Sequence, residues 1–357
     1  MPKRMLAPLD QIEPRRICVI KPSALGDVVQ ALPVLAGLRA RWPAADIAWV
    51  INRSLAELLA GHPELDRVLE FDRAGRALGR VARAASLSTE LRRARFDLTI
   101  DLQGLLRSGF MTLATWAPRR VGMNTAREGA RLAYTDTINV PTEMPAVERY
   151  WLVAKALGCP GSPPTPKLGI RQSDHAWAAL RLASLPRPVL MIHPGARWET
   201  KRWPPKHFAE LARRARQSFG AGVVLVGAPD DLHRCATIAA ALEGNCVNLA
   251  GQAGLLQLAA LCAAADVFLS GDTGPMHMAA AVGTPVVGVF TCTSTTRAGP
   301  YGAGHRVVAT GVSCAASYLK MCPTLACMQE LGADRVWPAL VATLGEAVER
   351  ARARAAI

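Results

Sequence analysis

The sharpest chemical signal in the chain is the segment 271–277, which reads GDTGPMH and follows an apolar run typical of a buried strand. Its two glycines let a backbone approach a ligand closely, and its proline suits the first turn of a helix. The N–H groups of Thr273 and Gly274 would then point at a phosphate, and His277 lies where it would contact one too. Asp272 would bind a sugar hydroxyl. The alternative for His277 is a purely structural role.

Two further loops of the second half carry charges after a predicted strand. In the segment 193–204 (HPGARWETKRWP), Lys201 and a neighbouring arginine follow a glycine turn and precede a proline that opens a helix. This arrangement suits a diphosphate, with Lys201 as a point charge, although an ordinary solvated basic loop has the same composition. Asp231 follows the strand predicted at Gly222–Gly227. It would accept from ribose hydroxyls, or it would only cap the next helix.

The first loop of the chain offers a carboxylate at a helix start. A strand predicted at Ile17–Lys21 runs into the segment 22–27 (PSALGD), which is neither a Walker A loop nor a G-x-G-x-x-G fingerprint. Asp27 is either an N-cap or a general base that takes the proton of an attacking hydroxyl. The two roles are compatible, since a helix N-terminus helps to keep a carboxylate ionised.

The spacing of metal-ligand types predicts no metal site. Asp272 and His277 lack a third ligand at a suitable distance along the chain. Cys314, Cys322 and Cys327 are spaced eight and five apart, without a C-x-x-C pair or a fourth ligand. We therefore expect no metal and no other cofactor.

The elements that must position these loops follow an α/β pattern in which short β-branched runs alternate with helical ones. The pattern occurs twice and is separated by a proline-rich stretch, 158–188, so we predict two doubly wound domains, 1–170 and 171–357, that face each other across a cleft. A basic helix predicted at 333–356 would dock on either domain. The predicted strands are Ile17–Lys21, Ile47–Asn52, Val68–Phe71, Leu98–Leu102, Val189–His193, Gly222–Gly227, Val247–Leu249, Val267–Ser270 and Pro285–Phe290, and the clearest helices are Asp27–Arg41, Leu105–Trp116 and Ser173–Leu185.

Composition limits the partners and the compartment. The net charge of +14 favours an anionic partner, while few aromatics and no recognisable motif argue against nucleic acid. Nine scattered cysteines suit reduced thiols, and no signal peptide or spanning segment is evident, so we expect a soluble, cytoplasmic protein. Four arginines at helical spacing form either a solvated face or a basic stripe for lipid phosphates and the inner membrane surface; they are Arg73, Arg76, Arg80 and Arg83.

Five segments in register resemble the ADP-heptose:lipopolysaccharide heptosyltransferases, glycosyltransferase family 9. They are 21–27 (KPSALGD), 101–104 (DLQG), 193–196 (HPGA), 200–204 (TKRWP) and 271–277 (GDTGPMH). The resemblance covers nearly the whole chain. It implies a GT-B fold of two Rossmann-like domains, with the acceptor bound by the N-terminal domain and the ADP-sugar by the C-terminal one. It also implies an inverting, metal-independent transfer of heptose from ADP-L-glycero-D-manno-heptose to Kdo-lipid A or heptosyl-Kdo-lipid A, an anionic lipid-linked acceptor of the lipopolysaccharide inner core.

The resemblance also assigns roles to individual residues. Asp27 matches the proposed catalytic base, Lys201 the lysine on the donor diphosphate, and Asp231 an acid near the ribose. Asp272 matches the aspartate that holds heptose hydroxyls, and Thr273, Gly274 and His277 match the diphosphate-binding turn. For the acceptor, we expect contacts from basic and amide side chains of the first domain: Arg76, Arg80, Gln103, Arg107 and Arg127.

Departures from the family pattern leave the acceptor open. The segments 125–128 and 146–149 are similar to enzymes that add the first heptose, but Pro145 stands where a histidine is frequent. The region 314–328 is similar to enzymes that add the second heptose, but Ser317 replaces a cysteine. The alternatives are a relative with another nucleotide-sugar donor or a protein or glycan acceptor, a nicotinamide-dependent oxidoreductase, and a non-catalytic carbohydrate- or nucleic-acid-binding protein. The missing G-x-G-x-x-G argues against the oxidoreductase.

Overall fold

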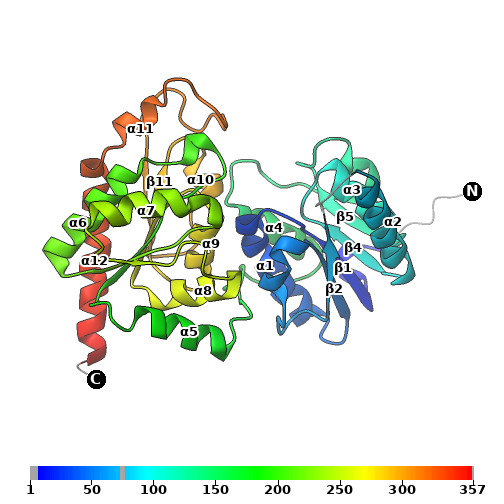
Figure 1. The fold of residues 1–357 in the computed structure, drawn as a ribbon. Coiled ribbons are helices and arrows are strands. Elements are labelled where there is room, and N and C mark those ends of the chain that lie inside the picture. The colour runs from blue at the N-terminus through cyan, green and yellow to red at the C-terminus, as the bar shows by residue number, and fades with distance from the viewer. Residues whose placement is uncertain (1–6, 73–76, 356–357) are drawn as a thin grey trace, which may run out of the picture. The chain divides into compact units, whose positions relative to one another are not determined.

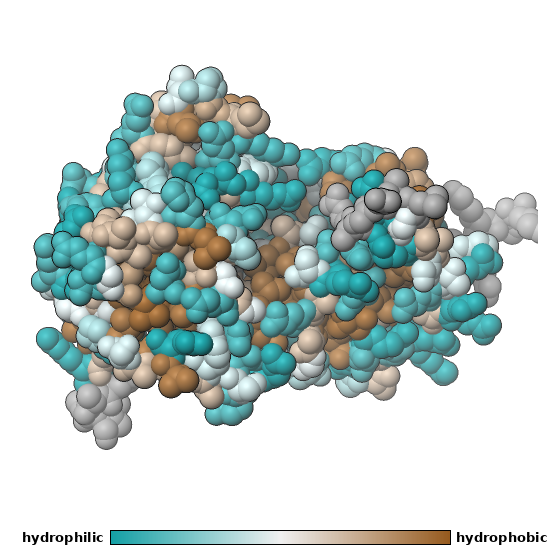
Figure 2. Space-filling view, viewed as in Figure 1, coloured by the Kyte–Doolittle hydropathy of each residue, from teal (hydrophilic) through white to brown (hydrophobic). Residues whose placement is uncertain are grey.

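The structure, a computed structural model, describes residues 7–72 and 77–355 and divides into two compact units, 1–169 and 170–357 (Figure 1). Figure 2 shows that hydrophilic residues cover most of the visible face and that apolar residues gather in a few patches. Within the described ranges, no helix is both long and apolar enough to span a bilayer.

Unit 1 is a parallel six-stranded sheet with the order β3-β2-β1-β4-β5-β6. Strand β1, at the centre of this sheet, is apolar on both faces, because helices cover both sides of a parallel sheet. The helices α1 and α4 pack together, and α2 packs with α3 (Figure 1). The strands are β1 (Arg16–Ile20), β2 (Asp46–Asn52), β3 (Arg67–Phe71), β4 (Leu98–Asp101), β5 (Arg119–Met123) and β6 (Asp136–Ile138), and the helices are α1 (Leu25–Arg41), α2 (Ala77–Arg93), α3 (Leu106–Ala114) and α4 (Ala146–Ala156).

Unit 2 repeats this topology with the order β12-β11-β10-β7-β8-β9. One core cluster joins its sheet to α6, α7 and α12, and a second joins it to α5, α8 and α9. The strands are β7 (Val189–His193), β8 (Gly222–Leu225), β9 (Val247–Asn248), β10 (Val267–Gly271), β11 (Val286–Phe290) and β12 (Arg306–Ala309). The helices are α5 (Gln172–Leu182), α6 (Pro205–Phe219), α7 (Leu232–Ala241), α8 (Leu255–Ala264), α9 (Gly274–Ala281), α10 (Thr295–Ala298), α11 (Ala326–Glu330) and α12 (Ala333–Ala355). Short 3₁₀ turns lie at Leu9–Gln11, Arg53–Leu59, Ala130–Ala133, Glu199–Lys201 and Pro229–Asp231.

The sequence pattern did not predict three of the strands, namely β5, β6 and β12. Strand β5 opens on two arginines, which do not indicate a buried strand. The structure supplies their partners: Arg119 forms a bidentate ion pair with Asp136 on β6, at 3.1 and 2.9 Å. Arg120 donates to the carbonyl oxygens of Ala133 and Ala117, each at 2.7 Å. Charges with such partners are tolerated inside a sheet.

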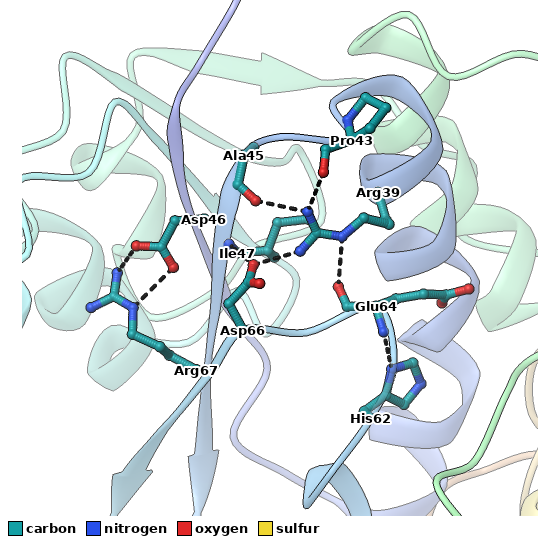
Figure 3. Close-up of polar contacts among 9 residues, drawn as sticks. All are labelled: Arg39, Pro43, Ala45, Asp46, Ile47, His62, Glu64, Asp66 and Arg67. Carbon is teal, nitrogen blue, oxygen red and sulfur yellow. Dashed lines mark hydrogen bonds and ion pairs between the residues drawn. The ribbon is translucent and has the colours of Figure 1, made fainter.

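A polar network fastens the end of α1 to β2 and β3 in unit 1 (Figure 3). The Arg39 guanidinium donates to the carbonyl oxygens of Pro43 and Ala45 and forms an ion pair with Asp66 at 2.5 Å. Asp66 also accepts from the Ile47 N–H at 2.7 Å. Burial alone would raise the pKa of Asp66, but these hydrogen bonds outweigh it and lower the pKa. The network therefore holds α1, whose first turn carries Asp27, against its sheet.

The C-terminal helix α12 belongs to unit 2. It packs against α6, β10, β11 and β12. Its apolar side chains recur every three or four positions, the spacing of one helix face, and enter the unit 2 core: Val336, Leu340, Leu344 and Ala347. The sequence did not decide on which of the two domains this helix docks. The structure shows that α12 packs on unit 2.

Candidate active site

Both sheets have the same doubly wound order, and the candidate residues follow the strands at the point where that order reverses. In unit 1 this point lies between β1 and β4, and in unit 2 between β7 and β10. Loops at the carboxyl ends of two such strands leave in opposite directions and form the crevice in which α/β sheets bind ligands. Asp27 and Gln103 follow β1 and β4, while Lys201 and Asp272 follow β7 and β10. These four predicted positions therefore lie in loops at the switch points, whereas Asp231 follows the neighbouring strand β8.

Lys201 and Asp272 meet at the switch point of unit 2. The Lys201 Nζ lies 2.5 Å from Asp272 Oδ2, and the Thr293 hydroxyl donates to the same oxygen at 2.7 Å. Both charged side chains are mostly buried. The Cβ of an alanine at Gly271 would lie 2.9 Å from the Lys201 carbonyl oxygen, so the two loops need this glycine to approach. An ammonium group in this position can also donate to a phosphate oxygen, because it has three N–H bonds.

The next residues form the N-terminus of α9. Thr273 is the N-cap, and its hydroxyl accepts from the Met276 N–H at 3.4 Å. Gly274 and Pro275 occupy the first helical positions, as the sequence indicates. His277 is buried within the first turns of the helix. A helix start with a nearby lysine is a ready anion-binding arrangement.

Asp231 packs tightly over the loop that follows β7. Its Oδ2 accepts from the Ala228 N–H at 3.1 Å and lies 3.9 Å from His193 Nε2. A Cβ added at Gly195 would come within 2.2 Å of the carboxyl group, so this position requires glycine. Burial lowers the pKa of His193, against the opposing effect of Asp231. Asp231 is thus a nearly buried acceptor, and its side chain does not cap the following helix α7.

An aromatic side chain beside Lys201 was not anticipated. The Trp198 ring has Lys201 Nζ 4.4 Å and Lys320 Nζ 5.5 Å from its centroid. The segment that carries Lys320 is held against the loop that follows β7, because Thr200 donates to the Leu319 carbonyl oxygen at 2.6 Å. A cavity of about 390 Å³ opens here, lined by Arg197, Trp198, Glu199, Lys320 and Met321.

In unit 1, Asp27 lies at the third position of α1 and is half-buried. Helix α1 begins two residues earlier, at Leu25, so Asp27 is not its N-cap. Its Oδ2 instead accepts from the Ala24 N–H at 3.2 Å, as the acid of a capping box does. The Tyr150 hydroxyl donates to Oδ1 at 3.4 Å. Structural and catalytic roles remain compatible, because each oxygen keeps further accepting capacity.

Lys21 supports this carboxylate from the end of β1. Its buried ammonium donates to the Leu102 carbonyl oxygen at 3.1 Å and lies 4.8 Å from the Tyr150 ring centroid. Burial would lower the pKa of Lys21, but Asp27 and Tyr150 outweigh it and raise the pKa. Burial raises the pKa of the Tyr150 hydroxyl, which therefore stays protonated as a donor. The Lys21 ammonium therefore stays charged and interacts electrostatically with Asp27.

Gln103 joins the two loops at the unit 1 switch point, because its Oε1 accepts from the Ser23 N–H at 3.2 Å. The turn beneath it is built on Asp101, which accepts from the Gln103 and Gly104 N–H groups and from the Tyr134 hydroxyl at 2.8 Å. Burial raises the pKa of Asp101 despite these hydrogen bonds. Gln103 is thus close to the Asp27 loop.

The predicted basic acceptor contacts are more dispersed. Arg127 is exposed and reaches this region through its backbone, whose N–H donates to the Gly104 carbonyl oxygen at 2.8 Å. Arg107 stacks on Phe71, with 5.4 Å between its guanidinium carbon and the ring centroid. Arg80 is exposed on α2. Arg76, like Arg73, lies outside the described residues.

The predicted arginine stripe is not wholly solvated, since Arg83 is half-buried and lies 3.6 Å from Asp72.

All nine cysteines are free thiols. Cys314 is exposed, and Cys322 lies 3.6 Å from the Thr324 hydroxyl, a contact that lowers its pKa. In the part of the chain that the structure describes, no three His, Cys, Asp or Glu side chains are grouped as metal ligands would be.

Several site residues were missed from sequence, for different reasons. Lys21 directly follows β1 and His193 is the last residue of β7, so a strict search of strand ends would have found both. Thr293 follows β11 in the same way. Tyr150 and Lys320 carry no such signal, because α4 and the segment before α11 reach their loops only through the fold.

Comparison with known proteins identifies the family of the chain. Residues 84–327 match the family model described as "Glycosyltransferase family 9 (heptosyltransferase)". The chain belongs to glycosyltransferase family 9. It is therefore an enzyme, a glycosyltransferase, and its two parallel sheets have the GT-B fold.

Individual relatives cover most of the chain. It is 30% identical to lipopolysaccharide heptosyltransferase 1 of Pseudomonas aeruginosa, over 86% of this chain and 87% of the relative. The structure of Escherichia coli ADP-heptose lps heptosyltransferase II matches with a TM-score of 0.75 and 27% identity, covering 93% of this chain and 99% of that one. The structure of Escherichia coli heptosyltransferase WaaC with ADP matches with a TM-score of 0.72 and 26% identity, covering 92% and 99%.

Proposed function

We propose that this family 9 glycosyltransferase transfers heptose from ADP-L-glycero-D-manno-heptose to an anionic acceptor of the lipopolysaccharide inner core, with inversion and without a metal. The observation that carries the proposal is the meeting of Lys201 and the α9 N-terminus at the switch point of unit 2. There, a fixed ammonium and backbone N–H groups are arranged for a diphosphate. The relative from Pseudomonas aeruginosa and the WaaC structure with ADP support the acceptor class and the nucleotide.

The donor half of the mechanism needs charge stabilisation of the leaving ADP. Lys201, the N–H groups of Thr273 and Gly274, and His277 would bind the diphosphate, while Asp272 holds heptose hydroxyls and Asp231 lies at the ribose. Donors that are fixed before reaction stabilise the developing charge at little reorganisation cost. This is the role that a metal ion plays in other transferases, so we propose that no metal or other cofactor is required.

The acceptor half needs a base. Asp27 would remove the proton of the acceptor hydroxyl as that oxygen attacks the anomeric carbon, in a single displacement that inverts the configuration. The Lys21 ammonium interacts electrostatically with this carboxylate, and Tyr150 and Ala24 orient it by hydrogen bonds. Gln103, Arg107, Arg127, Arg80 and Arg76 are proposed for the acceptor. We propose Kdo-lipid A or heptosyl-Kdo-lipid A as the acceptor, and we place the enzyme in the cytoplasm, peripheral to the inner membrane surface.

The decisive experiment is calorimetric binding of ADP, UDP, GDP and NAD in EDTA. We expect ADP to bind selectively. Lys201→Met removes one charged phosphate contact, so ADP affinity should fall about 10- to 100-fold. Lys206→Met is the control, because Lys206 is exposed on α6, five residues further on. A preference for UDP or GDP would leave the family intact but exclude the heptose donor, and unchanged ADP binding by Lys201→Met would exclude the diphosphate site.

The alternative is a family 9 transferase with another donor sugar or a protein or glycan acceptor. The departures at Pro145 and Ser317 keep it open. Transfer assays with purified ADP-heptose and either Kdo-lipid A or heptosyl-Kdo-lipid A decide between first and second heptose addition. The anomeric configuration of the product, measured by NMR, tests inversion.

A further inference from the structure

Helix α3 of unit 1 buries small and polar residues and exposes its large apolar ones, the reverse of the usual arrangement. Its buried face consists of small or hydroxylated residues plus one methionine, namely Ser108, Gly109, Met111 and Thr112. Its large apolar side chains point to solvent instead: Leu106, Phe110 and Leu113, at positions i, i+4 and i+7 of one helical face. Phe110 is 63% exposed. An amphipathic helix of a soluble domain normally buries its apolar face. Helix α3 instead exposes these apolar side chains at the surface.

The reversal has a packing cause on the inner side. A Cβ at Gly109 would lie 3.1 Å from the Ala130 Cα, so α3 approaches the 3₁₀ turn Ala130–Ala133 too closely for large residues. The buried hydroxyls are satisfied locally, since Ser108 donates to the Leu105 carbonyl oxygen and Thr112 to that of Ser108, each at 2.8 Å. This explains the small inner residues, but it does not require apolar residues outside.

Trp116, just beyond the helix, extends the exposed stripe. It is 68% exposed and has a φ of 54°, in the left-handed region that bulky residues avoid. The Arg92 guanidinium of α2 lies 4.0 Å from its ring centroid. We name the four exposed side chains Leu106, Phe110, Leu113 and Trp116 the α3 patch. An indole kept in solvent in a strained conformation, beside a cation, is typical of an interfacial anchor.

The charge around the α3 patch selects its partner. Helix α2 and the segment 106–132 expose two acidic residues, Glu90 and Glu128, and five arginines, namely Arg80, Arg92, Arg93, Arg127 and Arg131. Helix α2 and the 3₁₀ turn with exposed Arg131 and Leu132 both pack on α3. An apolar stripe rimmed by cations matches a bilayer with anionic headgroups. A second copy fits poorly, because a two-fold contact would place arginine rims against each other.

We propose that the α3 patch inserts into the interfacial region of an anionic membrane. The inference extends the proposed function, because a lipid-linked acceptor requires the enzyme to work at a membrane surface. It differs from the arginine stripe predicted from sequence, since apolar residues of α3 make the central contact and arginines surround it.

The test is binding of the full chain to vesicles of phosphatidylcholine, with or without phosphatidylglycerol. The double variant Phe110→Gln, Leu113→Gln should bind anionic vesicles roughly tenfold or more weakly, because two apolar side chains no longer enter the interface. Leu180→Gln is the control, because Leu180 is an exposed leucine of α5 in unit 2. Melting curves verify that each variant is folded.

A charge variant separates the two parts of the surface. Arg92→Glu, Arg131→Glu should weaken binding to anionic vesicles and leave binding to neutral ones unchanged, while Arg352→Glu on α12 should do neither. Wild-type levels of binding by the Phe110, Leu113 variant would overturn the proposal. So would a wild-type dimer that this variant dissociates without loss of vesicle binding, since the partner would then be a second copy. The vesicles contain no sugar acceptor, so a failed transfer reaction does not affect this result.

Discussion

At the scale of single residues, Asp27 has a capping contact and a proposed role as general base, which sequence spacing could not separate. Its Oδ2 accepts from the Ala24 N–H, and its Oδ1 accepts from Tyr150. Capping of this kind contributes about 1 kcal/mol to stability, whereas a general base contributes about 10²- to 10⁴-fold to a rate. The two roles therefore predict different losses on substitution.

Asp27→Asn keeps the shape and a hydrogen-bond acceptor but removes the base. We expect transfer to fall about 10²- to 10⁴-fold, with a small change in melting temperature and nearly unchanged ADP affinity. Initial rates and calorimetry measure these quantities. Tyr150→Phe is the matched variant, since it removes one donor to Asp27 and should reduce the rate less. Retention of most activity by Asp27→Asn would mean that another group is the base.

At the scale of elements, the loop that follows β7 depends on close approach between segments that follow different strands. The loop after β7 passes Asp231 so closely that Gly195 has no room for a side chain. The two switch-point loops have the same constraint at Gly271. Gly195 and Gly271 are needed because no side chain fits between the segments. They are not needed for an unusual backbone conformation, because neither has a positive φ.

Gly195→Ala should therefore displace the Asp231 carboxyl group, which a new Cβ would meet at 2.2 Å. Overpacking of this kind costs roughly 1–3 kcal/mol, and the displaced loop should also bind ADP more weakly. Gly345→Ala is the control within α12, where a Cβ meets nothing within 4 Å. It should stabilise the protein by about 0.5–1 kcal/mol through helix propensity. Denaturant unfolding and calorimetry compare the two, and equal stabilities would refute the packing argument.

At the scale of the whole molecule, buried histidines link stability to pH. Burial lowers the pKa of His193 in unit 2 and of His62 in unit 1 below the ordinary value of 6.5. Between each folded pKa and about 6.5, the unfolded chain binds more protons than the folded one. The free energy of unfolding is therefore highest above this window and falls as pH drops through it.

His193→Gln should flatten this pH dependence, because glutamine does not titrate. The measurement is the free energy of unfolding of unit 2 at a series of pH values between about 7 and 5, compared with wild type. His62→Gln should flatten the dependence of unit 1 in the same way. His207 and His305 also have lowered pKa values, so part of the slope in unit 2 should persist. An unchanged slope in His193→Gln would show that His193 is not buried as a neutral ring.

The sequence by itself determined the α/β class, the position of most strands and the loops that carry Asp27, Lys201, Asp231 and Asp272. These are local signals: apolar runs, glycines and prolines at helix starts, and charged residues at strand ends. It did not determine β5, whose arginines are explained only by Asp136 on the neighbouring strand. Nor did it predict that Asp27 accepts from Tyr150, or that Thr293 shares Asp272 with Lys201.

Only the tertiary structure decided those contacts, because they join residues between 17 and 123 positions apart. It also decided which face of α3 is buried. The periodicity of Leu106, Phe110 and Leu113 indicates a helix with an apolar side, and by itself it would place that side in the core. The close approach of the turn at Ala130 reverses the assignment, because only small residues fit between them. A periodic pattern gives the face of a helix, and the neighbouring backbone decides whether that face is turned inward.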